Sequence, residues 1–547
     1  MDGSIEFQDA TIVDGTGRPP WTGHVLVDGG HISRVAETPA GADREIECVG
    51  KYLTPGFIDM HAHSELHLLS EPTAVEKLSQ GITTEVLGQD GVSVAPVRAA
   101  SKAEWATRIQ PLDGTLDERW QWTTVEEYLS KLEAVSPAVN CAYYAPHGNL
   151  RSLLAGFEDR PLEDAEIQSL QAELLEALDD GAFGLSKGMI YPPSSYATDD
   201  ELLALAETLA ERNTFMISHV WNETDRVVES IERYLEICNR GGCQAHVSHL
   251  KVGGKDNWGA SENVLELFDK AENRGQRVTF DQYPYTSGST MLTALLPPLA
   301  RTGDTDAIIA RLDDDDTRAE IAADINSPGD WENLARAAGT WDNILVTQTA
   351  SGNFQGRTIA ELATARDCKP VEVMCDLLIE EHLNVTMVDF VMAETDISRF
   401  IADTRGTICT DGIFGGKPHP RVTGAFSRVL ERYVRERSVL SIEQAVYKAA
   451  GHPAAILGLS NRGRIKEGYR ADLVVFDLDS VRERGTYEDP LRRADGSEYV
   501  LVNGAVAIDG GKSTATRSGQ VLRSNEEWES DSRPPESKRR QGLAIGK

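Results

Sequence analysis

Two histidines separated by one residue, His61 and His63, end the apolar segment GFIDM. Side chains at positions i and i+2 of a strand point to the same face, so both imidazoles can bind one metal ion. Taken alone the pair is a weak signal, because two exposed loop histidines have the same spacing. His219 and His249 also end apolar runs, and Asp411 closely follows the run TIC. Together these five residues indicate a metal-dependent active site.

Such a site requires strands that deliver distant residues to one place. Apolar, strand-like runs alternate with helical patterns in the middle of the chain, which is typical of a parallel sheet. Eight such runs close into a (β/α)8 barrel, whose chemistry lies just past the strand ends. The predicted strands are Gly56–His61, Thr83–Leu87, Asn140–Ala145, Ala182–Ser186, Phe215–Ser218, Gln244–Ser248, Val278–Tyr283 and Thr407–Thr410. The polar residues at or just past their ends are His61, His63, Asp90, His147, Lys187, His219, His249, Tyr283 and Asp411.

Both ends of the chain differ from this middle. Residues 1–54 and 462–524 contain short β-branched runs separated by Gly and Asp, which predicts one small β-sandwich built from both termini. The barrel then occupies residues 55–461, with an insertion at about 300–400 that we expect to cover the mouth of the active site. The polar tail 525–547 is expected to be disordered.

Charge and cysteine content narrow the class of protein. The 547 residues include 87 acidic and 54 basic residues, a formal net charge of −33. Such a surface repels phosphate, so nucleic acids and anionic membranes are not expected partners. The seven scattered cysteines, the acidic N-terminus and the lack of an apolar run of about 18 residues predict a cytoplasmic protein with reduced thiols.

Longer strings carry a family resemblance. GFIDMHAH, SHLK at 248–251 and TDG at 410–412 resemble the amidohydrolase superfamily of metal-dependent hydrolases. More narrowly, the chain is similar to the N-acyl-D-amino-acid deacylases (D-aminoacylases) from about residue 5 to 510. The strings that carry this likeness are GLSKGMIYPPSSYA, DQYPYTSGST, GKPHPRVTGAFSRVLERYVRE and GRIKEGYRADLVVFD.

The resemblance implies an assignment of roles. His61, His63 and Asp411 would bind one Zn²⁺, and His219 and His249 a second. Zinc makes water nucleophilic near neutral pH, and Asp411, rather than forming a mere Asp-Gly turn, would act as general base and then general acid. The substrate would be an N-acyl-D-amino acid. Its carboxylate would contact cations or hydroxyl groups among Lys251, Tyr283, Arg421, Tyr191 and Ser289, and His147 would either line the site or serve the fold.

Three positions depart from that family's pattern. Asp90 stands where these deacylases have a cysteine ligand, and Lys187 stands where they have a small residue. We therefore expect a carboxylated Lys187 that bridges two Zn²⁺ ions per subunit, as in dihydroorotases and hydantoinases. Alternatively, Lys187 is a plain cation that binds an acidic substrate, and Asp90 is the ligand in place of the cysteine. Trp221 replaces an arginine and would make its wall of the site apolar.

Two other functions remain open at this point. The first is another amidase of the same superfamily, such as a cyclic amide hydrolase or a dipeptidase, which the departures at Lys187, Asp90 and Trp221 favour. The second is a non-catalytic binding protein with an amidohydrolase-like fold. A non-catalytic relative would usually have lost metal ligands, whereas all five expected positions are filled here.

Overall fold

The computed structural model describes residues 3–114 and 120–527. At its centre, parallel strands hydrogen-bond in the orders β6-β8-β9, β10-β11-β12-β13-β14-β19 and β20-β7. Because β6 and β7, β9 and β10, and β19 and β20 are successive pieces of one path, the ladder returns to its start, in the order expected of a (β/α)8 barrel. The strands are β6 (Phe57–Asp59), β7 (Ala62–His63), β8 (Ile82–Leu87), β9 (Asn140–Tyr143), β10 (Ala145–Pro146), β11 (Gly184–Gly188), β12 (Phe215–His219), β13 (Gln244–Val247), β14 (Val278–Gln282), β19 (Gly406–Ile408) and β20 (Gly412–Ile413). Each predicted strand overlaps one of them.

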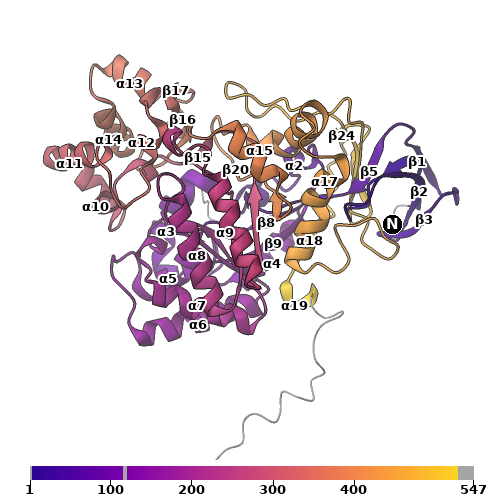
Figure 1. Cartoon of the computed structure of the whole chain (residues 1–547), viewed down its shortest axis with the longest axis horizontal. Coiled ribbons are helices and arrows are strands. Elements are labelled where there is room, and N and C mark those ends of the chain that lie inside the picture. Colours follow the sequence, from indigo (N-terminus) through magenta and orange to yellow (C-terminus); the bar gives the residue numbers. More distant parts are fainter. Residues whose placement is uncertain (1–2, 115–119, 528–547) are drawn as a thin grey trace, which may run out of the picture.

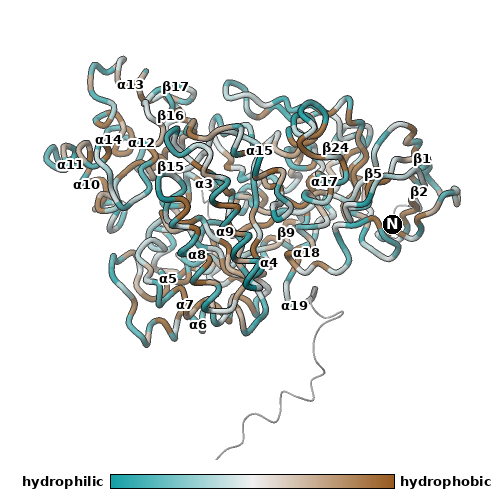
Figure 2. Tube along the Cα trace, in the orientation of Figure 1, coloured by the Kyte–Doolittle hydropathy of each residue, from teal (hydrophilic) through white to brown (hydrophobic). Residues whose placement is uncertain are grey.

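Amphipathic helices cover the outside of these strands. In α8 (Val227–Gly241), the residues Ile231, Tyr234, Leu235 and Cys238 are buried on one face. The helix ends at Gly242, whose positive φ of 81° is readily adopted by glycine. Figure 2 shows the resulting alternation of brown and teal residues along α8 and its neighbour α9 (Ser261–Asn273).

The two chain ends combine in one sheet, at the opposite end of the molecule from the helical insertion (Figure 1). Its order is β24-β23-β22-β21-β5-β1-β2-β3, with β4 paired to β1. The strands are β1 (Ile5–Ile12), β2 (Trp21–Asp28), β3 (His31–Ala36), β4 (Arg44–Glu47), β5 (Tyr52–Pro55), β21 (Leu473–Phe476), β22 (Ser497–Val502), β23 (Ala505–Asp509) and β24 (Lys512–Ser513). Hydrogen bonds join all nine strands in one sheet, and the packing of these strands as a β-sandwich stays a prediction.

This sheet supplies two apolar faces because side chains alternate along a strand. In β21, Leu473 and Val475 belong to the core of the terminal sheet, whereas Val474 and Phe476 belong to the core shared with the barrel. The terminal sheet is therefore attached to the barrel by burial of apolar side chains.

The insertion lies between β14 and β19 and begins earlier than predicted. It contains an antiparallel sheet of β15 (Gly288–Met291), β16 (Ile344–Thr349), β17 (Arg357–Thr358) and β18 (Val385–Asp389). Its helices include α10 (Thr305–Leu312), α11 (Asp315–Ile325), α12 (Leu334–Ala338), α13 (Ile359–Arg366) and α14 (Pro370–Glu380).

Other expectations concern the cysteines, the membrane and the tail. All seven cysteines fall within the described residues and are free thiols. In the described parts of the chain, no helix is long and apolar enough to cross a membrane. The predicted disordered tail lies outside the described residues except for 525–527, which belong to the short helix α19 (Ser524–Glu527).

Candidate metal centre and substrate pocket

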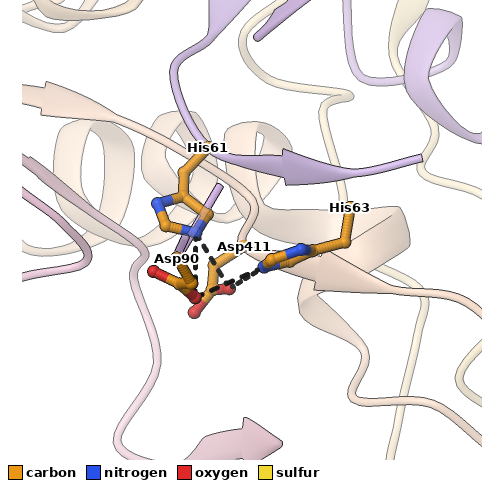
Figure 3. A group of neighbouring side chains, drawn as sticks. All are labelled: His61, His63, Asp90 and Asp411. Carbon is orange, nitrogen blue, oxygen red and sulfur yellow. Dashed lines mark ion pairs between the residues drawn. The ribbon is translucent and has the colours of Figure 1, made fainter. Parts of the chain in front are cut away.

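Four buried side chains converge at the end of the first barrel strand (Figure 3). His61 Nε2 lies 3.5 Å from an oxygen of Asp90 and 3.7 Å from an oxygen of Asp411. His63 Nε2 lies 3.6 Å and 3.5 Å from the same two oxygens. These distances are too long for hydrogen bonds, but two ligands of a tetrahedral Zn²⁺ with bonds of about 2.1 Å lie about 3.4 Å apart. The four ligand atoms therefore fit a shared cation.

A second ligand group adjoins the first through Asp90. The other oxygen of Asp90 lies 3.3 Å from His249 Nε2, which in turn lies 3.2 Å from His219 Nδ1. Asp90 thus offers one oxygen to each group, and the three residues form a second set that could hold a metal ion. The spacing suits two cations with one carboxylate between them.

Backbone contacts bring the first and last strands of the ring together. The amide of Asp411 donates to the carbonyl of His61 over 2.8 Å. One residue earlier, the amide of Thr410 donates to Asp59 over 2.8 Å, and the buried Lys77 donates to the other Asp59 oxygen over 2.8 Å. Asp411 itself has a positive φ of 47°, a conformation uncommon outside glycine. The network around Asp59 therefore holds Asp411 beside the two histidines.

Asp281, which is not among the predicted site residues, supports the histidine ligands. Its carboxylate accepts from the amide of His249 over 2.6 Å and lies 2.9 Å from His246 Nε2. It also lies 3.7 Å from Nδ1 of His61. A carboxylate inside an otherwise buried strand (VTFDQ) was the available signal. His246 is thus bound to Asp281 and not directed at the ligand groups.

The electrostatics of the first ligand group favour positive charge on its histidines. Burial lowers the pKa of His61, but the carboxylates of Asp90 and Asp281 outweigh it and raise that pKa to about 10. Burial likewise lowers the pKa of His63, and Asp411 and Asp90 raise it to about 10. Burial opposes ionisation of Asp411, yet Arg421 and the histidines hold its pKa far below the usual value. The same potential that attracts protons to these imidazoles would attract divalent cations.

Unsatisfied atoms point to the same conclusion. Both ring nitrogens of His61, one oxygen of Asp90 and Nε2 of His219 are buried without a hydrogen-bond partner among the described residues. Buried polar atoms are normally satisfied, so such a cluster calls for an explanation. Imidazole nitrogens and carboxylate oxygens are ordinary zinc ligands, so the residues present fit the expected metal.

The structure does not bring Lys187 to these ligands, and the predicted lysine bridge is wrong for this geometry. Its Nζ lies 4.2 Å from the centre of the Trp221 side-chain ring and 4.8 Å from that of Tyr234. Tyr234 belongs to α8, which covers the outside of the parallel strands. Among the described residues, this Nζ has no hydrogen-bond partner. Burial lowers the pKa of Lys187 to about 7.

The physical reason is strand register. Lys187 pairs with Ser218, while the next residue, Gly188, pairs with the ligand His219. Because alternate side chains face opposite sides of a sheet, Lys187 faces away from the side to which His219 points. At Gly188 itself, a Cβ would lie 2.2 Å from the carbonyl oxygen of Asp90. The turn that carries Asp90 therefore lies against the strand end, and of the two alternatives the geometry favours Asp90 as the shared ligand.

A pocket of about 540 Å³, including its open mouth, adjoins both ligand groups. Arg421, at the start of α16 (Arg421–Arg428), is fully buried and pairs with Asp411 over 2.8 Å. It also donates to the carbonyl of Ser289 over 3.0 Å and stacks 4.5 Å from the ring centre of Tyr283. The hydroxyl of Tyr283 is buried without a partner in the described structure. These groups form one side of the pocket.

Lys251 lies on the same side, next to the second ligand group. Its ammonium lies 2.6 Å from Glu223 and 2.7 Å from His249 Nδ1. Tyr191, on another side, shares a hydrogen bond of 2.7 Å with Thr290. The pocket thus contains five of the six predicted substrate-binding residues, namely Lys251, Tyr283, Arg421, Tyr191 and Ser289.

Two further residues that were considered for the pocket walls lie outside the pocket, and His147 takes the structural one of its two predicted roles. His147 does not line the pocket; it is buried between Glu201, 2.9 Å from its Nε2, and Ser194, 3.1 Å from its Nδ1. Trp221 does not line it either, because its ring lies between Lys187 and Arg233, whose guanidinium is 4.0 Å from the ring centre. The two departures at Lys187 and Trp221 are therefore neighbours outside the pocket, and they do not change its polarity.

Three acidic residues of the pocket were missed as site residues. Glu332 comes from the insertion and accepts from the amide of Glu223 over 2.6 Å, and each of the two has an oxygen 3.6 Å from His219 Nε2. Asp389, in β18, is buried, which together with the charge of Glu332 raises its pKa to about 6. Glu223 stands four residues after His219, a spacing that could have been a signal. Glu332 and Asp389 lie in the insertion, where the sequence offered none.

Comparison with known proteins agrees with this geometry. Residues 44–508 match the model of the amidohydrolase family. The chain is 33% identical over 522 residues to an N-acyl-D-aspartate deacylase of Alcaligenes xylosoxydans xylosoxydans, covering 94% of this chain and 93% of that protein. Among solved structures, it resembles an N-acyl-D-glutamate deacylase from Bordetella bronchiseptica, complexed with zinc and a phosphonate mimic of the tetrahedral intermediate (TM-score 0.80, 32% identity, 96% and 100% of the two chains). It also resembles a D-aminoacylase studied for its binuclear metal centre (TM-score 0.80, 31% identity, 95% and 99% covered). The chain belongs to the amidohydrolase family.

Proposed function

We propose that this protein hydrolyses the amide bond of N-acyl-D-amino acids, releasing a carboxylate and a free D-amino acid. The observation that carries the proposal is the position of a cationic, hydroxyl-bearing pocket wall directly beside two metal-ligand groups. A carboxylate anchored on that wall would place an adjacent amide against the metal ligands. The preference for the D configuration is supported by the names of the relatives.

Zinc is the proposed cofactor, with two ions per subunit. His61, His63 and Asp411 would hold one ion, His219 and His249 the other, and Asp90 would contribute to both. Zinc in such a site lowers the pKa of water and polarises a carbonyl group. The carbamate on Lys187 is not part of this proposal.

The side chains of the pocket divide the remaining work. Asp411 accepts a proton from the attacking water and passes it to the departing amine nitrogen, so that water and amide become a carboxylic acid and an amine. Arg421 binds the substrate carboxylate through its planar fork of donors, and Lys251 adds a second positive charge. Tyr283, whose hydroxyl is buried and unpartnered in the described structure, donates to the same carboxylate.

We also propose the domain boundaries that the sequence predicts. Residues 55–461 would form one barrel domain with the insertion described above, and residues 1–54 with 462–524 would form the composite terminal domain. We propose a cytoplasmic location and a small-molecule partner.

The proposed activity is tested with purified protein and pairs of enantiomers. N-acetyl-D-methionine, N-acetyl-D-aspartate and N-acetyl-D-glutamate are compared with their L forms, with hydantoins and with dipeptides, and the released amine is measured. We expect hydrolysis of at least one D substrate, more than 100-fold slower hydrolysis of its L form, and loss of activity with a chelator that is restored by Zn²⁺. Full activity after complete removal of metal, or equal rates on D and L forms, would contradict the proposal.

A further inference from the structure

A second pocket of about 650 Å³ adjoins the first, and Tyr191 lines both. Three short stretches of chain contribute residues to both pockets. Leu112, Thr290 and Ile190 line the first pocket, and their near neighbours Pro111, Met291 and Pro192 line the second. These residues form the partition between the two pockets, and Tyr191, which lines both, stands in it.

Part of the lining of the second pocket comes from strands opposite the carboxylate anchors. Lys251 and Tyr283 follow β13 and β14, the sixth and seventh strands of the ring, and Arg421 follows β20 in the eighth. Two walls of the second pocket, Val92 and Pro192, follow β8 and β11, the second and fourth strands. A molecule whose carboxylate is held by residues after the sixth to eighth strands therefore extends toward the loops after the second and fourth strands, which supply these two walls of the second pocket.

Amide geometry identifies which end that is. In a trans secondary amide, the Cα of the amino acid and the first carbon of the acyl chain lie on opposite sides of the C–N bond. With the amide at the metal ligands and the amino-acid carboxylate on Arg421, the acyl chain points away from the anchors. The amino-acid side chain, which branches from Cα, stays nearer to them.

The lining indicates an apolar chain. Met291, Ala294, Ile308 and Leu383 contribute to the walls of the pocket. In the parts of the chain that the structure describes, no acidic residue lines it, although the whole chain has a net charge of −33. Apolar walls without carboxylates would accept several methylene groups.

One cation in this pocket lacks a counter-charge. Arg301, at the end of η5 (Pro298–Arg301), is only 7% exposed and lines the pocket. Its Nη1 donates to the carbonyl of Ile190 over 2.8 Å, but its Nε has no partner, and no described carboxylate lies within ion-pair distance. By contrast, Arg108 in the same pocket pairs with Glu104 over 2.7 Å and stacks 3.9 Å from the ring centre of Phe157.

An unpaired buried guanidinium is costly for a fold, since buried charges are normally paired. It is useful if a ligand brings the missing anion. We propose that the second pocket binds the acyl group of the substrate, and that Arg301 selects acyl groups with an apolar stem and a terminal carboxylate. The inference rests on the proposed deacylase function and names its acyl specificity.

The test compares three acyl groups on one D-amino acid: acetyl, hexanoyl and glutaryl. In the wild-type enzyme, kcat/KM for the glutaryl substrate should exceed that for the other two at least tenfold, as expected for a charge-assisted hydrogen bond. In Arg301→Met the glutaryl preference should be lost in favour of hexanoyl, while the acetyl substrate changes less than threefold. Arg301→Lys should retain part of the glutaryl preference.

Two further variants separate the pocket from general damage. Ala294→Leu fills the apolar wall without touching Arg301, and it should reduce both long substrates at least tenfold and acetyl less than threefold. Arg311→Met removes a nearby arginine that binds the carbonyls of Ala300 and Thr302 over 2.9 and 3.0 Å, outside the pocket lining, and it should leave the acyl preference unchanged.

The outcomes distinguish this inference from the proposed function. If the wild-type enzyme cleaves acetyl substrates but gains nothing from glutaryl, the acyl subsite is refuted and the deacylase function stands. The subsite is also refuted if Arg301→Met alters the preference among D-amino-acid side chains instead of acyl groups. If no N-acyl-D-amino acid of the series is cleaved, the proposed function itself fails.

Discussion

Asp281 offers a sharp test of how the histidine ligands are held, because the substitution Asp281→Asn removes one charge and almost no volume. The carboxylate accepts from the His249 amide over 2.6 Å and lies 2.9 Å from His246 Nε2, and it is fully buried. Burial opposes its ionisation, but His246 and His61 outweigh burial and hold the pKa of Asp281 far below the usual value. An asparagine retains one oxygen that can accept a hydrogen bond. Its NH₂ group takes the place of the second oxygen and faces either the His249 amide or His246 Nε2, which then loses its acceptor.

The expected magnitude follows from that lost acceptor. One hydrogen bond to a charged group contributes about 1.5–3 kcal/mol, which corresponds to about 10- to 150-fold in an equilibrium constant. Removing a group that orients metal-binding histidines commonly costs 10- to 100-fold in metal affinity or activity. We therefore expect Asp281→Asn to weaken zinc binding by about 10- to 100-fold.

The assay is zinc titration against a competing chelator, with thermal unfolding measured alongside. As a matched control, Asp509→Asn removes a carboxylate from a β-strand at the surface, where it pairs with Arg44 over 2.8 Å. Exposed pairs contribute little, so this variant should bind zinc within twofold of the wild type. Zinc affinity unchanged in Asp281→Asn, with the protein folded, would refute the inferred support of His61 and His249.

Three further predictions concern Arg421, whose substitution should impair substrate binding, and Lys187, whose substitution should leave zinc binding and activity nearly unchanged. Arg421→Met should raise KM for N-acyl-D-amino acids at least 100-fold, because it removes the buried fork of donors; steady-state kinetics would contradict this if KM changed less than fivefold. Lys187→Met should leave zinc content and kcat/KM within threefold of the wild type, since its Nζ faces Trp221 and not the metal ligands; loss of bound zinc in that variant would restore the lysine bridge. The same variant should change how stability depends on pH. Burial lowers the pKa of Lys187 to about 7 in the folded protein, whereas its unfolded pKa is near 10.5. Between these two values the unfolded state binds more protons, so the stability of the wild type rises with pH. At about 1.4 kcal/mol per pKa unit, chemical denaturation of the wild type relative to Lys187→Met should show a relative gain of a few kcal/mol from pH 7 to pH 10, and a flat difference would refute the buried-amine assignment.

The parallel strands could be predicted because local sequence determines them. Runs such as FMISH and QAHV are apolar, buried on both faces and bounded by polar residues, so their length and ends are encoded locally. The four histidines and Asp411 could be chosen as candidate ligands because they lie at or just past the predicted strand ends. The strands of the terminal sheet lie in the two chain ends, where short strands were predicted, but whether they join in one sheet depends on pairing between residues more than 400 apart, which local patterns do not encode.

The face of the strand to which Lys187 points could not be predicted from the sequence. A shift of one residue in register moves a side chain to the other face of a strand, and the sequence predicted the strand without fixing that register. The family pattern favoured a ligand, whereas the contact with Trp221 arises because both residues face the surrounding helices. Glu332 and Asp389 were missed for a related reason, since the insertion reaches the pocket only through its tertiary arrangement.

Zinc content of the Asp90 variants tests the shared-ligand arrangement most directly. We predict two zinc ions per subunit in the wild type by elemental analysis, near-complete loss of at least one ion in Asp90→Asn, and retention of both in Asp90→Cys, whose thiolate is also a zinc ligand. If Asp90→Asn keeps two ions and the full rate of amide hydrolysis, Asp90 does not join the two metal sites and the mechanism derived from them is wrong.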